Sequence, residues 1–402
     1  MWYGSISLIQ RFGKEEIAAV TKSIKNSSFL SGYTNKFLGG EEIQKFESEF
    51  ARFHGCKYGI SVNSGTTALF VAQKAAGVKP KNKVAVPCIT FTATTSQVIA
   101  CDAIPKFIDI DPNSNCMKTN SLSKTKFFIP VHLLGHPCNP EMIKEMKDGK
   151  AFVIEDCAQA MGAKYKNKIV GSMGDCGIFS FQETKHITTL GEGGMIITNN
   201  EEFAEKCRRI RNHGEYYMND TQVGYNFRLT EAQAAFGRVQ LKKLPKIIDT
   251  FRENAQLIFK NLPDEIIPPN IPKNISHSFL LLGCRFSTKS NLDKNQFLEK
   301  LTKNRKKFLD SDEKSDIKGI NFRPGKIIGA GYKVVQYQIP LYKKYRPKIS
   351  CKNGEEYVKN GLFLDIHRWR SKSEIKEELN IIKKTLESMK KNSWSNKYYL
   401  KL

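Results

Sequence analysis

The chain has 402 residues, of which 40% are hydrophobic and 26% are charged, and its formal net charge is +24. This composition is that of a globular protein long enough for two domains, and no apolar run reaches the length of a transmembrane helix. The lysines are spread along the chain rather than concentrated among aromatic residues, which disfavours a nucleic-acid interface.

Ten cysteines are scattered along the sequence without a C-x-x-C pair. This spacing argues against a zinc site and against a disulfide framework. The N-terminal residues show no long apolar segment followed by a cleavage site, so they do not resemble a secretory signal. We therefore expect a cytoplasmic protein with reduced thiols, without a metal, and without a nucleic-acid or membrane partner.

From residue 57 onward, short apolar runs alternate with helical segments. Such runs, separated by helices, predict a mostly parallel sheet covered on both faces. The expected strands are rich in Val, Ile and Phe and lie at 57–63, 83–87, 105–111, 126–135, 151–156, 176–181 and 193–199, with helices at 66–76 and 92–103.

The second half of the chain begins with a helix predicted over 201–213. A polar loop follows, and then a long helix opens after Thr230, a residue suited to cap it. Past Pro245 the chain becomes rich in lysine, with short strands and a last amphipathic helix over 373–389. The predicted class is α/β. A three-layer α/β/α large domain with an N-terminal arm covers residues 1–250, and a smaller α+β domain covers 251–402.

The stretch GTTALFVAQKAAG, residues 65–77, begins with a glycine and two threonines before an apolar helix. Hydroxyls at a helix start satisfy unpaired amides, so Thr66 and Thr67 are candidate capping residues. The free amides and the dipole of a helix start also attract phosphate. The two interpretations share one geometry and do not exclude each other.

A carboxylate ends the run AFVIED. Neighbouring strand residues point to opposite faces, so Glu155 and Asp156 cannot both serve one ligand. Ligands of such sheets bind at the carboxyl ends of the strands, which favours Asp156. The alternative is that this carboxylate caps a loop.

A lysine follows the next buried run. Ser180 ends the strand CGIFSF, and Lys185 precedes a glycine turn that leads back into MIIT. Partial burial lowers the pKa of an ammonium group and makes the neutral amine available as a nucleophile. Such lysines form Schiff bases with carbonyl compounds and with pyridoxal phosphate (PLP). The alternative for any single lysine is an ordinary solvated side chain.

Taken together, these parts match the requirements of PLP. Its phosphate needs anchors, its ring nitrogen needs an anion, its aldehyde needs an amine, and its ring needs an aromatic neighbour. The residues that meet these needs are Thr66, Thr67 and Ser180 for the phosphate, Asp156 for the nitrogen, Lys185 for the aldehyde and Phe91 for the ring.

Five segments, in order, resemble the DegT/StrS-type sugar aminotransferases, which are fold-type I PLP enzymes. The resemblance covers roughly residues 15–250 and is weaker beyond. The segments are FESEFARFHGCKYGISVNSGTTAL, PCITFTATTSQVIACDAIPKFIDID, EDCAQA, SFQETKHITTLGEGGMIIT and GYNFRLTEAQAAFGRVQL.

The resemblance implies a role for each matching residue. Lys185 binds the cofactor aldehyde and moves protons, Asp156 pairs with the ring nitrogen, and Gln159 contacts the ring hydroxyl. Asn226 reaches the phosphate of a neighbouring subunit, so the active unit is a twofold dimer. The remaining cofactor contacts are Gly65, Thr66, Thr67 and Ser180 at the phosphate and Phe91 against the ring.

The resemblance also implies the reaction, which is transfer of an amino group from L-glutamate or L-glutamine to a nucleotide-linked keto sugar. The cofactor alternates between PLP and pyridoxamine phosphate, and the product serves amino-sugar and polysaccharide biosynthesis. Relatives that carry histidine at the lysine position perform dehydration, whereas this chain has Lys185 followed by His186, which favours transamination. Candidates for the substrate side, each with an ordinary loop role as its alternative, are His213, Tyr225, Arg228 and His367.

Three other functions stay open at this point. A PLP-dependent sugar dehydratase or deoxygenase would bind the same cofactor, and a keto-cyclitol aminotransferase would share the fold. The segment SGYTNKFLGGEEIQ, residues 31–44, is longer than in many relatives and resembles the subgroup that includes cyclitol enzymes. A non-catalytic sensor is the third, because fold does not dictate function.

Overall fold

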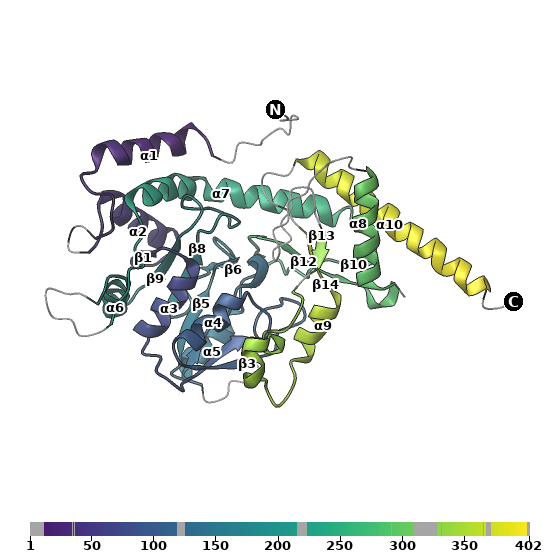
Figure 1. The fold of residues 1–402 in the computed structure, drawn as a ribbon, viewed down its shortest axis with the longest axis horizontal. Helices are drawn as coiled ribbons and strands as arrows, with labels where there is room; N and C mark the ends of the chain where they lie inside the picture. Colours follow the sequence, from purple (N-terminus) through teal and green to yellow (C-terminus); the bar gives the residue numbers. More distant parts are fainter. Residues whose placement is uncertain are drawn as a thin grey trace.

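A computed structural model describes most of the chain, and Figure 1 shows its arrangement around a central sheet. The described residues are 12–33, 35, 37–118, 125–214, 223–290, 292–308, 328–330, 332–364, 366 and 371–399. Within these residues, no helix combines the length and the apolar character that crossing a membrane requires. The helices are α1 (Lys14–Asn26), α2 (Glu41–Phe53), α3 (Gly65–Ala75), α4 (Thr92–Ala100), α5 (Pro140–Asp148), α6 (Glu201–Arg211), α7 (Glu231–Phe259), α8 (Lys294–Phe308), α9 (Lys352–Asn360) and α10 (Lys372–Tyr399).

The large sheet has seven strands in the order β1-β9-β8-β5-β4-β2-β3. All neighbours pair in parallel except β9, which runs antiparallel to both β1 and β8. The prediction of a mostly parallel sheet is therefore confirmed, and β9 is its one reversed strand. The bounds are β1 (Tyr58–Val62), β9 (Gly194–Thr198), β8 (Cys176–Ser180), β5 (Phe152–Asp156), β4 (Phe127–Phe128), β2 (Lys83–Pro87) and β3 (Ile104–Ile108).

Both faces of this sheet are covered, as the continuous apolar strands predict. Helices α3, α4 and α6 pack together on one face, while α2 and α7 lie on the other (Figure 1). Neighbouring residues of β8 show the alternation, because Ile178 belongs to the hydrophobic cluster under α3 and Phe179 to the cluster under α2 and α7. The α/β/α layering is thus built from strands that bury both of their faces.

The C-terminal part adds two small sheets and the helices α8, α9 and α10. The predicted domain boundary at residue 250 lies inside α7, which continues through Pro245. Side chains of α7 share one hydrophobic cluster with β12, β14, α8 and α10, and the two-domain division stays a prediction. The first small sheet contains β10 (Ile266–Ile267), β12 (Leu282–Phe286), β14 (Gly361–Leu364) and β13 (Ile328–Ala330), and the second contains β11 (Ile275–Ser276), β6 (Lys164–Tyr165) and β7 (Lys168–Ile169).

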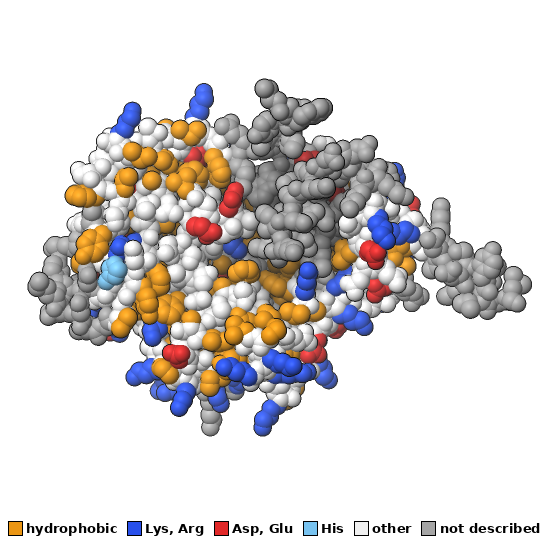
Figure 2. Space-filling model, in the orientation of Figure 1, with side chains coloured by type: hydrophobic (Ala, Val, Ile, Leu, Met, Phe, Trp, Pro, Cys, Tyr) orange, Lys and Arg blue, Asp and Glu red, His pale blue; other side chains and the backbone are white. Residues whose placement is uncertain are grey.

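The surface and the thiols agree with the composition of the chain. Figure 2 shows lysine and arginine side chains spread along the edge of this face, with apolar and acidic side chains between them. All ten cysteines are buried, and none is paired in a disulfide; the reduced state of the thiols stays a prediction.

A buried ion pair joins three elements at the β1 edge of the sheet. Arg211, at the end of α6, donates through Nη1 to Glu47 Oε1 of α2 at 2.6 Å and to the carbonyl oxygen of Ser61 at 3.0 Å. The same Glu47 oxygen accepts both the amide and the hydroxyl of Ser61, each at 2.8 Å. Both charged side chains are almost fully buried. Because water does not reach either charge, each is compensated mainly by the other.

We expect Arg211→Met to lower the free energy of unfolding by about 3–5 kcal/mol, because it leaves the Glu47 carboxylate buried and unpaired. Urea unfolding followed by circular dichroism measures the change. The matched control is Lys144→Met, which breaks the exposed Lys144–Asp148 pair and should leave the free energy of unfolding almost unchanged, because exposed ion pairs contribute little. Equal losses in the two variants would contradict the assignment of Arg211 as a structural anchor.

Candidate active site

Three strand ends meet beside the start of α3. Val62 of β1 pairs with Gly194 of β9, which in turn pairs with Ser180 of β8. A Cβ atom on Gly65 would lie 2.7 Å from Ser180 Cβ, and one on Gly194 would lie 2.4 Å from the Ser64 carbonyl oxygen. Glycine at these two positions therefore allows the first turn of α3 to lie directly against Ser180.

The cap of α3 is Ser64, two residues before the first of the predicted pair of threonines. Its Oγ accepts the amide of Thr67 at 3.0 Å, and Thr67 Oγ1 accepts the amide of Ser64 at 3.1 Å. Thr67 thus belongs to a capping box, but the prediction that Thr66 caps the helix is wrong, since Thr66 follows the cap and is exposed.

The first turn of α3 keeps the properties of an anion site. The first amides of a helix, here those of Gly65 and Thr66, have no acceptor within the helix, and the dipole places positive potential at this end. The exposed Thr66 side chain and the Ser180 hydroxyl border the same turn. This is an arrangement that binds phosphate.

Asp156 lies at the carboxyl end of β5 and is 4% exposed. Its Oδ2 accepts the Thr94 hydroxyl at 2.8 Å, and its Oδ1 accepts the amide of Ala158 at 3.1 Å. Burial raises the pKa of this carboxyl, while the two hydrogen bonds and the nearby Lys185 and His132 oppose the rise. A buried carboxylate held in this way can receive a further N–H donor.

Glu155 points to the opposite face, as the strand alternation predicts. Its carboxylate accepts His132 Nε2 at 2.9 Å and the amides of Gly171, Met173 and Gly174 at 3.0, 2.7 and 2.6 Å. This residue is a structural anchor for the loop before β8.

Lys185 follows β8 in a loop that returns to β9, and its side chain is half-buried. Burial lowers the pKa of the amine, while the carboxylates of Asp156 and Glu192 raise it. His186 is turned into the core, where its Nε2 lies 2.9 Å from the Ser278 carbonyl oxygen and its ring packs on Phe251. Of these two neighbours, therefore, only Lys185 is available to a ligand near Asp156.

Gln159 is buried and forms hydrogen bonds on both sides of its amide. Its Oε1 accepts the amide of Leu134 at 2.9 Å, and its Nε2 donates to the Tyr332 hydroxyl at 3.1 Å. Burial raises the pKa of Tyr332 to about 12, so this hydroxyl is protonated near neutral pH. A residue of the C-terminal part thus reaches the neighbourhood of Asp156.

Phe91 stands at the N-terminus of α4 with 52% of its surface exposed. Its carbonyl oxygen accepts the amide of Thr94 at 3.2 Å, and Thr94 in turn contacts Asp156. One helical turn therefore presents both an exposed aromatic ring and the partner of the buried carboxylate.

The segment from Tyr225 to Arg228 lies against the turn before α3, because the amide of Asn63 donates to the Phe227 carbonyl oxygen at 2.9 Å. Asn226 is exposed, and Tyr225 stacks on Phe227 with a 4.9 Å centroid separation.

Two of the predicted substrate residues have neighbours that fix them. Arg228 donates to Asn212 Oδ1 at 2.5 Å and lies over the ring of Tyr33. His213 is exposed, and its amide donates to the Tyr225 carbonyl oxygen at 3.0 Å. The fourth candidate, His367, lies outside the described residues, and the substrate roles of all four stay predictions.

The residues present fit PLP by the chemistry of their donors. A helix start with the Ser180 hydroxyl suits a phosphate, and a buried carboxylate suits a protonated ring nitrogen. The Lys185 amine, with a pKa lowered by burial, suits an aldehyde, and the exposed Phe91 ring suits the face of a pyridine. Because residue 65 is a glycine, the first turn of α3 can lie directly beside Ser180. A Cβ at this position would prevent that contact.

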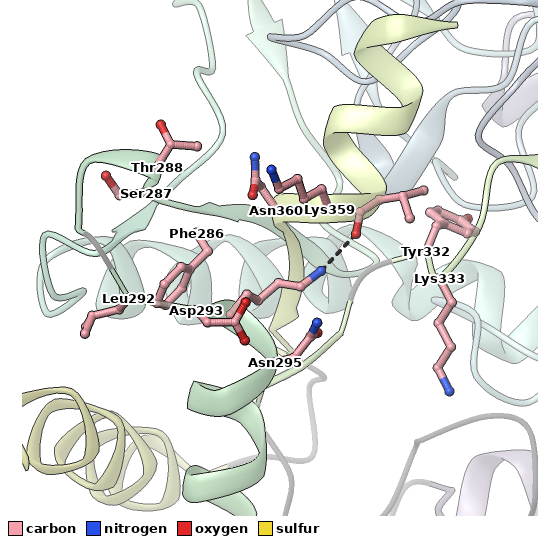
Figure 3. Close-up of a pocket in the computed structure, with 12 residues that line it drawn as sticks. Phe286, Ser287, Thr288, Leu292, Asp293, Asn295, Tyr332, Lys333, Lys359 and Asn360 are labelled. Carbon is pink, nitrogen blue, oxygen red and sulfur yellow. Dashed lines mark hydrogen bonds between the residues drawn. The ribbon is translucent and has the colours of Figure 1, made fainter. Parts of the chain in front are cut away.

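A separate cavity of about 610 Å³ lies in the C-terminal part, between the end of β12, the start of α8 and the end of α9 (Figure 3). Lys294 lines it and donates through Nζ to the Val358 carbonyl oxygen at 2.8 Å. Among the described residues that line this cavity, none is a predicted cofactor contact, and Tyr332 connects it to Gln159. We therefore locate the candidate active site at the strand ends and not in this cavity.

Sequence reasoning missed three residues of the site. Ser64 carried a signal, because serine is among the preferred residues at the N-cap of a helix. Thr94 and Tyr332 carried none, since their partners Asp156 and Gln159 are 62 and 173 positions away in the chain.

Comparison with known proteins gives consistent matches. Residues 11–309 match the DegT/DnrJ/EryC1/StrS aminotransferase family. A GDP-perosamine synthase of Escherichia coli O157:H7 is 36% identical over 281 residues, which cover 67% of this chain and 77% of that protein. A UDP-N-acetyl-3-dehydro-alpha-D-glucosamine 3-aminotransferase of Acidithiobacillus ferrooxidans is 35% identical over 274 residues, 66% of this chain and 72% of that protein. The crystal structure of an aminotransferase from Psychrobacter cryohalolentis superposes with a TM-score of 0.82 at 27% identity, covering 94% of this chain and 98% of that one.

The lowered pKa of Lys185 predicts how its amine reacts in the protein before any cofactor is added. In reductive methylation with formaldehyde, only the neutral amine reacts. At pH 7–8, Lys185 should therefore be modified faster than a lysine of the same exposure with an ordinary pKa. The reference is Lys144, whose pKa is raised by Asp148. Peptide mass spectrometry measures the ratio of the two rates, which should be highest at low pH and fall as the pH rises through the pKa of Lys185. A ratio that does not change with pH would contradict the lowered pKa.

Proposed function

We propose, from the premise that this chain belongs to the DegT/DnrJ/EryC1/StrS aminotransferase family, that it transfers the amino group of L-glutamate or L-glutamine to a nucleotide-linked keto sugar with PLP as cofactor. The chain is an aminotransferase of sugars. The single observation that carries the proposed chemistry is the juxtaposition of the buried Asp156 with the half-buried Lys185, beside the start of α3.

The named relatives support the choice of substrate class. One is a GDP-perosamine synthase and another acts on a UDP-linked 3-dehydro sugar. The net charge of +24 would help to gather such anionic substrates by its long-range field. The substrate side is proposed to include His213, Tyr225, Arg228 and His367.

Four groups of the chain would hold PLP. The start of α3, with Gly65, Thr66 and Thr67, binds the phosphate together with Ser180. Asp156 holds the proton of the ring nitrogen, Gln159 contacts the ring hydroxyl, and Phe91 covers one face of the ring and excludes water from it. When bound, the cofactor supplies an aldehyde that exchanges amino groups and a protonated ring that withdraws electrons.

Lys185 performs the proton transfers. Because burial lowers the pKa of its Nζ amine, a neutral base is available to accept the proton from the α carbon of the amino donor. Asp156 and Glu192 raise the same pKa, which keeps the amine basic enough to hold that proton. In the second half of the reaction the same steps would run in reverse, and the Lys185 amine would deliver a proton to the sugar carbon that receives the amino group.

The active unit is proposed to be a twofold dimer in which Asn226 binds the phosphate held by the other subunit. Asn226 is exposed in one chain. Large apolar side chains of the N-terminal region are exposed as well, with Ile17 at 62%, Phe29 at 69% and Tyr33 at 47%. Exposed apolar side chains in this number suit an interface between copies. The proposed compartment is the cytoplasm, because all ten cysteines are free and buried.

A dehydratase or deoxygenase of the same fold is the alternative for this site. The histidine that follows Lys185 does not support it, because His186 is 1% exposed and lies against Ser278 and Phe251. Transamination through Lys185 is therefore preferred, with a keto cyclitol as the other acceptor class to be included in substrate screens.

We expect Lys185→Ala to lower the rate of amino transfer at least about a thousandfold, because the variant lacks the group that moves the proton. The assay converts the protein to its pyridoxamine phosphate form and measures the return of the PLP absorbance with GDP- and UDP-linked keto sugars and with keto cyclitols. The control is Lys168→Ala in the exposed β7 strand, which should keep the wild-type rate. A Lys185→Ala variant that transaminates at a near wild-type rate would refute the assignment.

The shared site predicts complementation between two inactive variants. In a mixture of Lys185→Ala and Asn226→Asp subunits, half of the random dimers contain one chain of each kind. One of the two sites in such a dimer has both residues intact if Asn226 acts across the interface. About a quarter of the wild-type activity should return, measured after mixing and refolding. No recovery would place the Asn226 contact within its own subunit.

A further inference from the structure

Two buried threonines, Thr90 and Thr94, form a line of hydrogen bonds that ends at the Asp156 carboxylate. The Thr94 hydroxyl donates to Asp156 Oδ2 at 2.8 Å, and Thr94 Oγ1 lies 2.8 Å from Thr90 Oγ1. Thr90 and Thr94 are each 1% exposed. A threonine hydroxyl has one hydrogen, and that of Thr94 is directed at the carboxylate. Thr90 must therefore be the donor in the threonine pair, and the line runs from Thr90 through Thr94 to Asp156.

Hydrogen bonds from two parts of the chain, the start of α4 and Gln336, hold the backbone that carries this line. The amide of Thr94 donates to the Phe91 carbonyl oxygen at 3.2 Å, which is the first turn of α4. The side-chain Nε2 of Gln336 donates to the Thr90 carbonyl oxygen at 2.7 Å, and the backbone amide of Gln336 donates to the Cys88 carbonyl oxygen at 2.8 Å. The C-terminal part thus holds the loop before α4, and with it the backbone that carries Thr90.

Asp156 needs such a donor because few groups around it favour its charge. The described charged and titratable groups around it include Lys185 and His132, with Tyr332 and the buried thiol of Cys157 as neutral neighbours. The amide of Ala158 satisfies Oδ1. The Thr94 hydroxyl is the side-chain donor that opposes the cost of burying the carboxylate.

We propose that Thr94, supported by Thr90, is a positioning residue that keeps the Asp156 carboxylate ionised and directed at the ring nitrogen of the cofactor. This rests on the proposed function, because it assumes that Asp156 faces PLP. The same helical turn presents Phe91 to the face of the cofactor ring. The start of α4 therefore positions both contacts of the ring, the one at its face through Phe91 and the one at its nitrogen through Thr94 and Asp156.

The experiment compares Thr94→Val with Thr95→Val. Both replace a buried threonine of α4 by a residue of the same shape, but Thr95 Oγ1 has no hydrogen-bond partner among the described residues, so its loss should leave PLP affinity unchanged within about twofold. Thr94→Val should weaken PLP affinity about ten- to a hundredfold, since it removes a hydrogen bond to a charged group. Thr94→Ser, which keeps the hydroxyl, should stay within about threefold of the wild type. Titration of the cofactor-free proteins with PLP measures all three.

A pH series separates positioning from simple loss of structure. Removing a donor to the charged form makes Asp156 harder to ionise, so the pH below which PLP affinity falls should move up by about one unit in Thr94→Val and not in Thr95→Val. The thermal unfolding midpoints of the two cofactor-free variants show whether both are folded. If Thr94→Val does not fold, Thr90→Val decides, with an expected loss of about three- to tenfold in PLP affinity.

Two outcomes overturn the inference. One is that Thr94→Val and Thr95→Val have the same PLP affinity and the same pH midpoint, and the other is that Thr90→Val has no effect when Thr94→Val cannot be tested. A wild-type protein that binds no PLP gives a different result, because it would refute the proposed function itself.

Discussion

The burial of one carboxylate governs the arrangement of the candidate site. Asp156 has 4% of its surface exposed at the end of β5, and a buried charge is costly unless donors and opposite charges compensate it. The compensation comes from the Thr94 hydroxyl, the Ala158 amide and the amine of Lys185. The position of α4 and the course of the loop after β8 are both constrained by this requirement.

The order of the strands brings the other half of the site to the same edge. Because β9 runs antiparallel between β1 and β8, the end of β1 lies beside the end of β8. Helix α3, which begins directly after β1, therefore starts against Ser180, and Lys185 follows Ser180 by five residues. A single reversed strand thus places the helix start that suits a phosphate near the lysine and the carboxylate.

Both parts of the chain support the site. From α7, the side chain of Gln233 donates to the carbonyl oxygens of Thr189 and Glu192 at 3.3 and 3.2 Å, which holds the loop that contains Lys185. From the C-terminal part, Gln336 holds the loop before α4 and Tyr332 contacts Gln159. Packing of the C-terminal part is therefore coupled to the geometry around Asp156, although none of its described residues belongs to the predicted cofactor contacts.

The local elements of the fold could be predicted from the amino-acid sequence. Apolar runs and their spacing predicted where the strands of the large sheet lie, its buried faces and the helix that opens after Thr230. The run at 126–135 is the exception in extent, because only Phe127–Phe128 form a strand and Leu133–Gly135 form a 3-10 turn. Alternation along β5 selected Asp156 over Glu155. These features depend on neighbours within a few residues, where periodicity and capping chemistry act directly. The assignment of the helix cap to Thr66 instead of Ser64 is the local error, although serine is itself a preferred N-cap residue.

The partners of the site residues were decided by the tertiary structure alone. The reversal of β9, the burial of His186 against Ser278, the hydrogen bond from Thr94 to Asp156 and the contact of Tyr332 with Gln159 each join residues far apart in the chain. Such pairs are set by the packing of helices on the sheet, which no local pattern encodes. The sequence by itself therefore determined which chemical groups the protein carries at its strand ends, and the three-dimensional packing decided which of them meet and how their charges are balanced.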